Sequence, residues 1–326
     1  MRMTTLLAGT LSIFALTDSA FAESAENYPS RPLTYVVPGA AGGIVDNGAR
    51  FMAKVLTEKI GQPVIVENKP GAAGIVGCEY VLNAKPDGYT FMYGSQGPHG
   101  AYAYQYKKLS FDPFTAFTPV HGMAHSPMLF VVSADAPYKT FKELVEYAKK
   151  NPDAINYYSP GPGSASHLVS ELLQETGGFK MTQVTYKSSA TAMADVLANT
   201  IQVLWEYPVV LIPHIQAGKL RALGVTSDQR MPVLPDVPTF VEQGYPQAVY
   251  TGWATIAVSA ATPKPIVDKL AKAYSQALDD PSVIKYFHDQ GAGILQGYSG
   301  ERLRKFIADE NKKYKDLVTR AKVEPQ

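Results

Sequence analysis

Apolar and polar positions along this chain follow two alternating patterns, and their succession predicts strands followed by helices. Residues 33–37 form a short apolar stretch of the kind found in buried strands. From residue 44 to residue 60, apolar side chains recur at three- and four-residue steps, as on one face of a helix. Gly61 and Pro63 supply the stop signal. A loop of small residues at 39–43 therefore connects a strand to the start of a helix.

The same succession recurs down the chain. Short apolar stretches predict further strands at 64–67, 90–93, 128–133, 155–158, 183–186, 201–205, 220–226 and 251–258. Helical patterns lie between or after them: up to 84, at 140–151, from 167, up to 198, at 263–278 and from 301 onward. Strands that alternate with helices are typical of βαβ units and a parallel sheet, so we expect an α/β fold.

Two of these strands divide the chain. The strand at 128–133 is expected to cross from a first domain into a second, and the strand at 251–258 is expected to return. A chain of 326 residues is long enough for two domains of ordinary size. We therefore assign residues 23–128 and 252–326 to a first domain and residues 129–251 to a second.

Residues 1–22 carry the pattern of an export signal. Arg2 gives a positive start, residues 6–16 are apolar, and Ala20-Phe21-Ala22 is a small-x-small site that a signal peptidase accepts. The apolar stretch is shorter than the ~20 residues that a membrane span needs. We therefore expect export of the chain and cleavage near Ala22.

Composition narrows the classes of function. A net charge of +1 argues against a nucleic-acid binder. The single cysteine, Cys78, excludes an internal disulfide and a cysteine-based zinc site. His121 and His125 are four residues apart, but HGMAH does not read as helix and lacks the glutamate of a zinc protease, so no metal is expected. No cofactor is expected either, because the loop at 39–43 lacks the Gly-Lys-Ser/Thr ending of a phosphate loop.

The small-residue loop is the most informative feature. Backbone N–H groups at a helix start have no partner within the helix, and the helix dipole adds partial positive charge there. The loop has almost no side chains to cover those groups, which suits a bound carboxylate or phosphate. Its residues are Gly39, Ala40, Ala41, Gly42 and Gly43. Asp46 follows in the first helical turn, where a carboxylate pairs with the helix dipole or orders the loop.

Small-residue loops also follow later strands, and they carry hydroxyl, amide and imidazole groups that could contact the same ligand. The carboxyl ends of parallel strands share one edge of a sheet, which is where ligands bind in open α/β folds. The candidates are Ser95, Gln96 and His99 in the first domain and Ser164, Ala165, His167, Ser188, Ser189 and Thr191 in the second. Ser166 is expected to cap a helix instead.

A secreted hydrolase is an alternative reading of these loops. Ser164 and His167 could serve as nucleophile and base, but no acid is placed beside them and the chain has no G-x-S-x-G motif. A hydrolase would turn over an ester or an amide, whereas a binding protein would release its ligand unchanged. We favour capture over catalysis, so no catalytic residue is assigned.

Several segments together resemble one family, the Bug or TctC-like periplasmic solute-binding proteins of tripartite tricarboxylate transporters. They are YPSRPLTYVVPGAAGG with Asp46 after it, IGQPVIVENKPGAAG, KPDGYT, GPGSASHL, AGKLRALGVTS with Arg230 and PDVPT, and TGW. The resemblance covers nearly the whole chain after residue 22. It implies a type II periplasmic-binding-protein fold, in which two α/β domains hinged by two crossing strands close over a carboxylate. It also implies that residues 39–43 hold one carboxylate through backbone amides and ordered waters.

The resemblance implies location and partners as well. It predicts a monomer in the periplasm that binds a small carboxylate and is recognised by an inner-membrane permease. A ligand-loaded sensor subunit for a signalling receptor is a second reading of the same fold.

Some pocket positions depart from the family pattern. The first loop is Ala-Ala-Gly-Gly-Ile-Val-Asp rather than an unbroken glycine run, and Ser189 and Thr191 stand where glycine and proline are usual. Trp205-Glu206-Tyr207 stands where a Phe-Asp-like pair is usual, which adds Glu206 to the candidate ligand-binding residues. Bulkier aromatic walls suggest a flat, aromatic dicarboxylate such as terephthalate.

Overall fold

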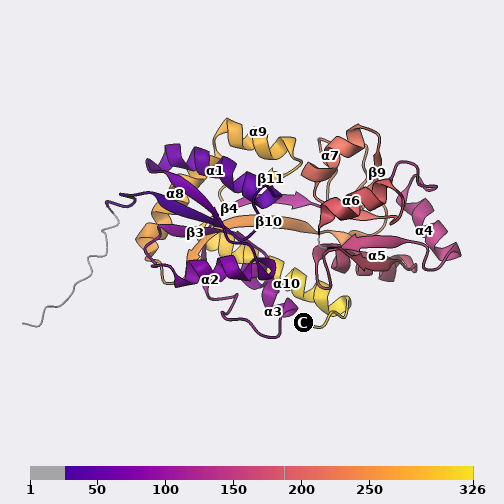
Figure 1. Ribbon diagram of the computed structural model, residues 1–326, viewed down its shortest axis with the longest axis horizontal. Coiled ribbons are helices and arrows are strands. Elements are labelled where there is room, and N and C mark those ends of the chain that lie inside the picture. The colour runs from indigo at the N-terminus through magenta and orange to yellow at the C-terminus, as the bar shows by residue number, and fades with distance from the viewer. Residues whose placement is uncertain (1–25, 187, 326) are drawn as a thin grey trace, which may run out of the picture.

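The computed structural model describes residues 26–186 and 188–325. The predicted export signal at 1–22 and Lys187 lie outside these residues. Figure 1 shows two lobes side by side, with the strands β4 (Phe117–Pro127) and β10 (Thr251–Ser259) running along the first lobe to the junction. Each lobe contains strands with helices packed against them, which confirms the predicted two-part α/β fold.

The first lobe is built on one sheet in the order β11-β4-β10-β3-β1-β2. Its other strands are β1 (Leu33–Val37), β2 (Val64–Asn68), β3 (Thr90–Ser95) and β11 (Gly293–Ile294). Its helices are α1 (Ile44–Ile60), α2 (Ile75–Asn83), α3 (Tyr102–Gln105), α8 (Lys264–Leu278), α9 (Pro281–Asp289) and α10 (Gly300–Arg320). The sheet is mixed rather than purely parallel, because β10 returns into the lobe and must run against both β3 and β4.

The second lobe holds two smaller groups of strands. Its strands are β5 (Leu129–Ser133), β6 (Asn156–Ser159), β7 (Thr182–Thr185), β8 (Leu204–Glu206) and β9 (Leu220–Val225). Its helices are α4 (Phe141–Lys150), α5 (Ala165–Gly177), α6 (Ser189–Leu197) and α7 (Pro208–Gln216). The order β8-β5-β9 is antiparallel, β6 pairs with β7 in parallel, and a single bridge between Tyr157 and Val203 links the two groups.

The two crossings between the lobes are joined by one buried threonine. The hydroxyl of Thr226 accepts a hydrogen bond from the Met128 N–H at 2.8 Å and donates one to the Tyr250 carbonyl at 2.6 Å. Backbone bonds run from Thr226 N–H to the Met128 carbonyl and from Tyr250 N–H to the Thr226 carbonyl. Thr226 is fully buried, so these bonds are shielded from water and hold the outgoing and returning segments together.

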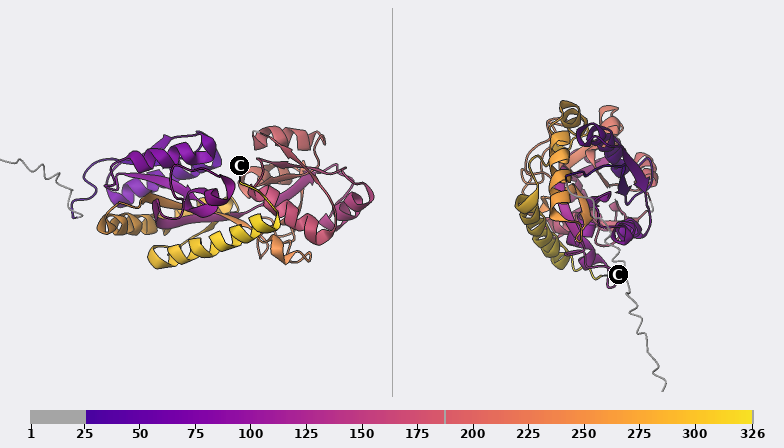
Figure 2. Two further views of the ribbon diagram at one scale, coloured as in Figure 1. Left: turned by 90° about the horizontal axis from the view of Figure 1, so that it is seen from below. Right: turned by 90° about the vertical axis from the view of Figure 1, so that its left-hand side faces the viewer.

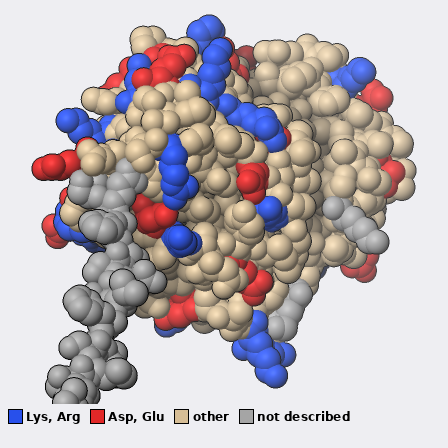
Figure 3. All heavy atoms as spheres, turned by 60° about the vertical axis from the view of Figure 1, so that its left-hand side comes forward, with Lys and Arg blue, Asp and Glu red and all other residues tan. Residues whose placement is uncertain are grey.

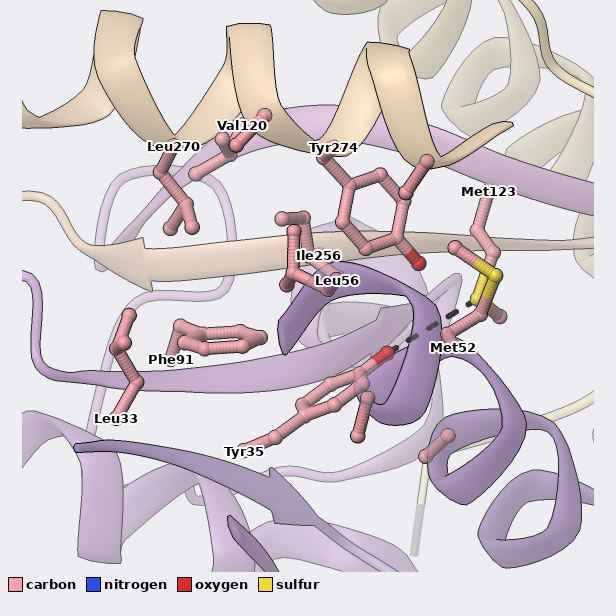
Figure 4. Packing of buried hydrophobic residues seen from close by; sticks show 14 of the residues in the cluster. Leu33, Tyr35, Met52, Leu56, Phe91, Val120, Met123, Ile256, Leu270 and Tyr274 are labelled. Carbon is pink, nitrogen blue, oxygen red and sulfur yellow. Dashed lines mark hydrogen bonds between the residues drawn. The ribbon is translucent and has the colours of Figure 1, made fainter. Parts of the chain in front are cut away.

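Each lobe has its own core. In the first lobe, α1 and α8 pack on one face of the sheet, as Figure 4 shows for Leu56, Ile256 and Leu270. The ring of Tyr35 stacks on that of Phe91, with centroids 4.6 Å apart. In the second lobe, β5 is buried on both faces, with Phe130 in one apolar cluster and Val131 in another. These separate cores let each lobe act as a unit around the crossing strands.

The C-terminal helix α10 contacts both lobes, although the sequence analysis assigns its residues to the first domain. Figure 2 shows it running beneath the first lobe toward the second. Its first half packs on the first lobe through Leu303 and Ile307. Its last turns contact α5, where Val318 lies with Leu168 and Arg320 forms an ion pair with Glu175 at 2.8 Å. The helix therefore braces the two lobes against each other.

The surface bears charges of both signs. On the face shown in Figure 3, basic and acidic side chains are interspersed rather than gathered in a patch of one sign. Within the described ranges, no helix is long and apolar enough to cross a membrane.

Candidate functional site

A cavity of about 530 Å³ lies between the lobes. We call it the central cavity. The first lobe contributes residues from α1, β3, β4 and β10, and the second lobe contributes the end of β6, the start of α5 and the end of β8. Tyr314 of α10 also reaches it. The central cavity therefore lies at the carboxyl ends of several strands, where ligands bind in open α/β folds.

The helices α1, α2, α5 and α7 all begin at the central cavity. Lining residues at or before their first turns are Ile44 and Val45 for α1, Ala73 and Gly74 for α2, Ser164 and Ala165 for α5, and Tyr207 and Val209 for α7. None of these helices has a side chain that accepts a hydrogen bond from its first N–H groups. The positive ends of their dipoles therefore meet at the central cavity. At α2 the Ile75 N–H is bonded to the Ala72 carbonyl, and at α7 the first residue, Pro208, has no N–H, so unpaired donors come mainly from α1 and α5.

Of the helices α4, α6, α8, α9 and α10, three have a side-chain cap at their start, whereas α8 and α10 have none. Thr140, Ser188 and Asp280 each accept a hydrogen bond from the first turn of α4, α6 and α9. None of these three helix starts contributes a residue to the lining. Within the described residues, no helix start with a side-chain cap borders the central cavity, although α8 and α10 also lack such a cap and start away from it.

The small-residue loop at 39–43 lies at the edge of the central cavity. Pro38 and Ile44 on either side of it line the cavity, whereas residues 39–43 do not. Gly39 is partly exposed and the other four loop residues are exposed, so no side chain seals the loop. The N–H of Gly42 is already engaged, because it donates to Oδ2 of Asp46 at 2.8 Å.

Asp46 is buried and organises this loop. Besides the Gly42 N–H, it accepts hydrogen bonds from Nε of Arg50 at 3.0 Å and from Nδ2 of Asn68 at 2.9 Å. Asn68 also donates to the Gly39 carbonyl at 3.2 Å. Burial acts to raise the pKa of Asp46, but the bonds from Arg50, Gly42 and Asn68 outweigh it, so the pKa lies below its ordinary value. Asp46 is therefore an ionised clamp beneath the loop.

Of the three predicted ligand-binding residues after β3, two line the central cavity and one lies in the core. Ser95 and Gln96 line the central cavity, and Oε1 of Gln96 accepts a hydrogen bond from the Tyr250 hydroxyl. His99 is buried outside the lining, with Nε2 2.9 Å from Oγ1 of Thr255. Burial lowers the pKa of His99 to about 4, so the ring is neutral near pH 7. Its position points to a structural role.

Of the three predicted ligand-binding residues at the start of α5, two line the central cavity and one does not. Ser164 and Ala165 line the central cavity, whereas His167 does not. Nδ1 of His167 accepts the Gly163 N–H at 3.1 Å, and no hydrogen bond between Ser164 and His167 is present among the described residues. The Ser164 hydroxyl instead donates to the Gly161 carbonyl at 2.7 Å. This geometry gives no support to a Ser–His pair. Ser166, predicted as the helix cap, lies inside α5, and Ser164 holds the capping position.

The candidates around α6 lie outside the lining, and Ser188 and Thr191 are exposed. Ser188 caps α6 by accepting the Thr191 N–H at 3.3 Å, and neither residue lines the central cavity. Ser189 is also outside the lining, but its side chain hydrogen-bonds to Glu206. Glu206 itself lines the central cavity at the end of β8.

Aromatic side chains make up much of the wall, and none of them is among the predicted ligand contacts. They are Tyr93, Tyr102, Tyr158, Trp205, Tyr207, Tyr250, Trp253, Phe287 and Tyr314. Gly48 of α1 was also missed: it is buried, it lines the central cavity, and a Cβ built on it meets nothing within 4 Å. A glycine in a helical apolar run gives no local sign that its open face borders a cavity.

The histidine pair of the sequence lies on a strand. His121 and His125 both belong to β4, and His125 lines the central cavity. Among the described residues, no group of three or more His, Cys, Asp or Glu side chains is placed to hold a metal ion.

Comparison with known proteins identifies the kind of protein to which this cavity belongs. The family described as "Tripartite tricarboxylate transporter family receptor" (TctC) matches residues 48–323 of this chain. A curated relative from Agrobacterium vitis, the UPF0065 protein in the TAR-I ttuE-ttuC' intergenic region, is 35% identical over 304 residues, which cover 89% of this chain and 88% of that protein.

Two solved structures extend the similarity to three dimensions. The periplasmic binding protein BugD is 36% identical with a TM-score of 0.81, and the match covers 92% of this chain and 100% of that one. R. palustris Rpa4515 with adipate is 31% identical with a TM-score of 0.84 and the same coverage of each chain. The matched family is described as a receptor and BugD as a periplasmic binding protein, which identifies this chain as a binding receptor rather than an enzyme. This chain therefore belongs to the tripartite tricarboxylate transporter receptor family, the TctC or Bug-type periplasmic solute-binding proteins.

Proposed function

We propose that this protein captures a small carboxylate in the central cavity and presents it to the inner-membrane permease of a tripartite transporter. The observation that carries the proposal is the convergence of the starts of α1, α2, α5 and α7, none capped by a side chain, on one cavity. Among the described residues, no Lys or Arg lines that cavity. Backbone N–H groups and helix dipoles are then the main source of positive potential for an anion.

The free energy of anion binding at such a site is the sum of several modest contributions. One helix start stabilises a negative charge by ~0.3–1 kcal/mol at an exposed site and by up to ~2 kcal/mol where it is partly buried. Several helix starts around one cavity add to each other when they face the same carboxylate. The hydroxyl of Ser95 lies in the same lining and supplies a further donor.

We further propose that the body of the ligand is flat and aromatic, with terephthalate as a dicarboxylate example. The aromatic wall supports this proposal. Tyr158, Tyr207 and Tyr250 line the second-lobe side, and Tyr93 and Trp253 line the first-lobe side. Aromatic pairs contribute ~0.5–1.5 kcal/mol beyond the burial of their area. A planar ring between these walls would be recognised by shape as well as by its carboxylate.

Residues on both lobes would close over this ligand. We propose that residues 129–251 move as one domain against residues 23–128 and 252–326, with Thr226 at the hinge. We also propose that residues 39–43 contact the carboxylate once the lobes close. Residues 1–22 are proposed to be removed on export. The mature protein is proposed to be a periplasmic monomer. The neighbour with adipate supports carboxylate capture by this fold.

Titration calorimetry on the purified mature chain tests this proposal. Terephthalate, adipate and citrate are titrated separately, and the solution is examined afterwards by mass spectrometry. We expect saturable binding of terephthalate, weaker binding of the two aliphatic acids, and recovery of unchanged ligand. A clear preference for adipate or citrate would overturn the aromatic part. No binding of any carboxylate would overturn the whole proposal.

A further inference from the structure

The electrostatic balance of the central cavity is unusual for an anion site. Among the described residues, its lining contains one carboxylate, that of Glu206, and no Lys or Arg. The N–H of Tyr207 donates a hydrogen bond to Oε1 of Glu206 at 2.9 Å, and the Ser189 side chain forms a second hydrogen bond with Glu206. No ion pair to Glu206 exists among the described residues. The protein therefore leaves acceptor capacity on Glu206 that faces the cavity.

Burial raises the pKa of Glu206, and the hydrogen bonds from the Tyr207 N–H and the Ser189 side chain act against that rise. The titratable groups around Glu206 carry no positive charge near pH 7. Tyr158 at the end of β6 and Tyr207 at the start of α7 have their pKa values raised to about 12 by burial, with the charge of Glu206 as a further cause. Both phenols are neutral near pH 7. His125 of β4, the one histidine of the described lining, has its pKa lowered by burial and is neutral as well. From α6 the facing group is the uncharged Ser189.

A carboxylate accepts hydrogen bonds and donates none when it is ionised. If the ligand placed a second carboxylate against Glu206, two negative groups would meet in a cavity without a cation from the described lining. A ligand group that donates a hydrogen bond would instead satisfy the free lone pairs of Glu206. The complementary ligand thus carries a carboxylate at one end and a donor at the other.

We propose that Glu206 selects aromatic carboxylates that bear a hydrogen-bond donor, such as an amino or hydroxyl group, on the side of the ring away from the anchoring carboxylate. This inference rests on the proposed function and narrows its ligand class. A dicarboxylate such as terephthalate meets the same requirement when one proton is shared between its second carboxyl and Glu206. Binding of terephthalate near pH 7 is then coupled to the uptake of one proton.

A series of para-substituted benzoates tests the proposal by calorimetry at pH 7. 4-Aminobenzoate and 4-hydroxybenzoate carry a donor, and 4-methylbenzoate has a similar shape without one. We expect the wild-type protein to bind the two donor ligands roughly 10- to 100-fold more tightly than 4-methylbenzoate, because a hydrogen bond to a charged group has about that effect. Affinity for terephthalate should fall as the pH rises from 6 to 8, and affinity for 4-aminobenzoate should not.

The Glu206→Gln variant is the matched control, because it keeps the shape and one acceptor while removing the charge. In this variant the preference for 4-aminobenzoate over 4-methylbenzoate should shrink to within about threefold. Its amide N–H can donate to a carboxylate, so terephthalate should bind more tightly than to the wild type and lose its pH dependence. If the variant does not fold, the wild-type series alone decides the question.

The outcomes distinguish a failure of the proposed Glu206 selectivity from a failure of the proposed carboxylate-binding function. Equal wild-type affinities for 4-aminobenzoate and 4-methylbenzoate would overturn the role of Glu206 and leave aromatic carboxylate capture standing. An unchanged preference in Glu206→Gln would do the same. Binding of adipate with no binding of any benzoate would overturn both the aromatic proposal and the role of Glu206.

Discussion

Replacing Gly48 with phenylalanine should abolish ligand binding while the protein remains folded. Gly48 lies in α1 with an ordinary helical backbone, it is buried, and its missing Cβ points into open space that borders the central cavity. A Cβ has room at this position, and a benzyl group would extend from it into space that the ligand needs. We expect the affinity for terephthalate to fall by at least roughly 100-fold, as for a steric clash built into a site.

Gly48→Ala provides the control for this substitution. Alanine is more favourable than glycine inside a helix by up to ~1 kcal/mol, so the free energy of unfolding should stay constant or rise. Its single methyl group should reduce the affinity only slightly. Gly42 in the small-residue loop is a poorer test site, because its φ of +79° strains any other residue. Wild-type affinity in a folded Gly48→Phe protein would show that the ligand binds outside the central cavity.

Replacing Asp46 with alanine should destabilise the protein and weaken binding together. The change removes the acceptor for the Gly42 N–H and for Nδ2 of Asn68, and it separates Arg50 from its partner. The side chain of Arg50 is half exposed and can be solvated, so most of the loss comes from the other two bonds. We expect the free energy of unfolding to fall by about 2–3 kcal/mol in urea denaturation. Binding should weaken because the loop at 39–43 loses its fixed shape.

The pH dependence of stability supplies an independent readout on Asp46. Its pKa is lower in the folded protein than the ordinary value of 3.8, so folding favours the ionised form. This contribution is fully present above the unfolded pKa and is lost as the pH falls through the folded pKa. Between pH 5 and pH 3 the wild-type protein should therefore lose more stability than Asp46→Asn. Parallel stability profiles for these two proteins would remove Asp46 as the clamp of the loop.

Local patterns in the sequence predicted the repeating units well. The strand at 33–37 and the helix at 44–60 were placed correctly, because the apolar period and Gly61 are local signals; Gly61 indeed ends α1 in the left-handed conformation. The helix predicted at 140–151 corresponds to α4, which Thr140 caps. By contrast, β4 begins at Phe117 within a stretch that reads as irregular, since His121 and Gly122 interrupt its apolar pattern. The helix α7 was also missed, because it contains Pro208 and Pro213.

The candidate site was predicted in outline and not in detail. The loops after β3 and β6 do reach the central cavity, since strand ends share an edge of the fold. The sequence could not show which aromatic residues face the cavity. Tyr157 and Tyr158 are neighbours in the chain, yet Tyr158 lines the cavity while Tyr157 packs in the core, because successive strand residues point to opposite faces. The dual contact of α10 likewise depends on residues far apart in the sequence, such as Arg320 and Glu175.

A crystal structure of the protein with terephthalate tests the central claim most directly. The account predicts the ring between the aromatic walls of the central cavity, with carboxylate oxygens within hydrogen-bond distance of backbone N–H groups at the starts of α1 and α5. A carboxylate bound to a surface lysine or arginine, or a ligand outside the cavity between the lobes, would contradict it.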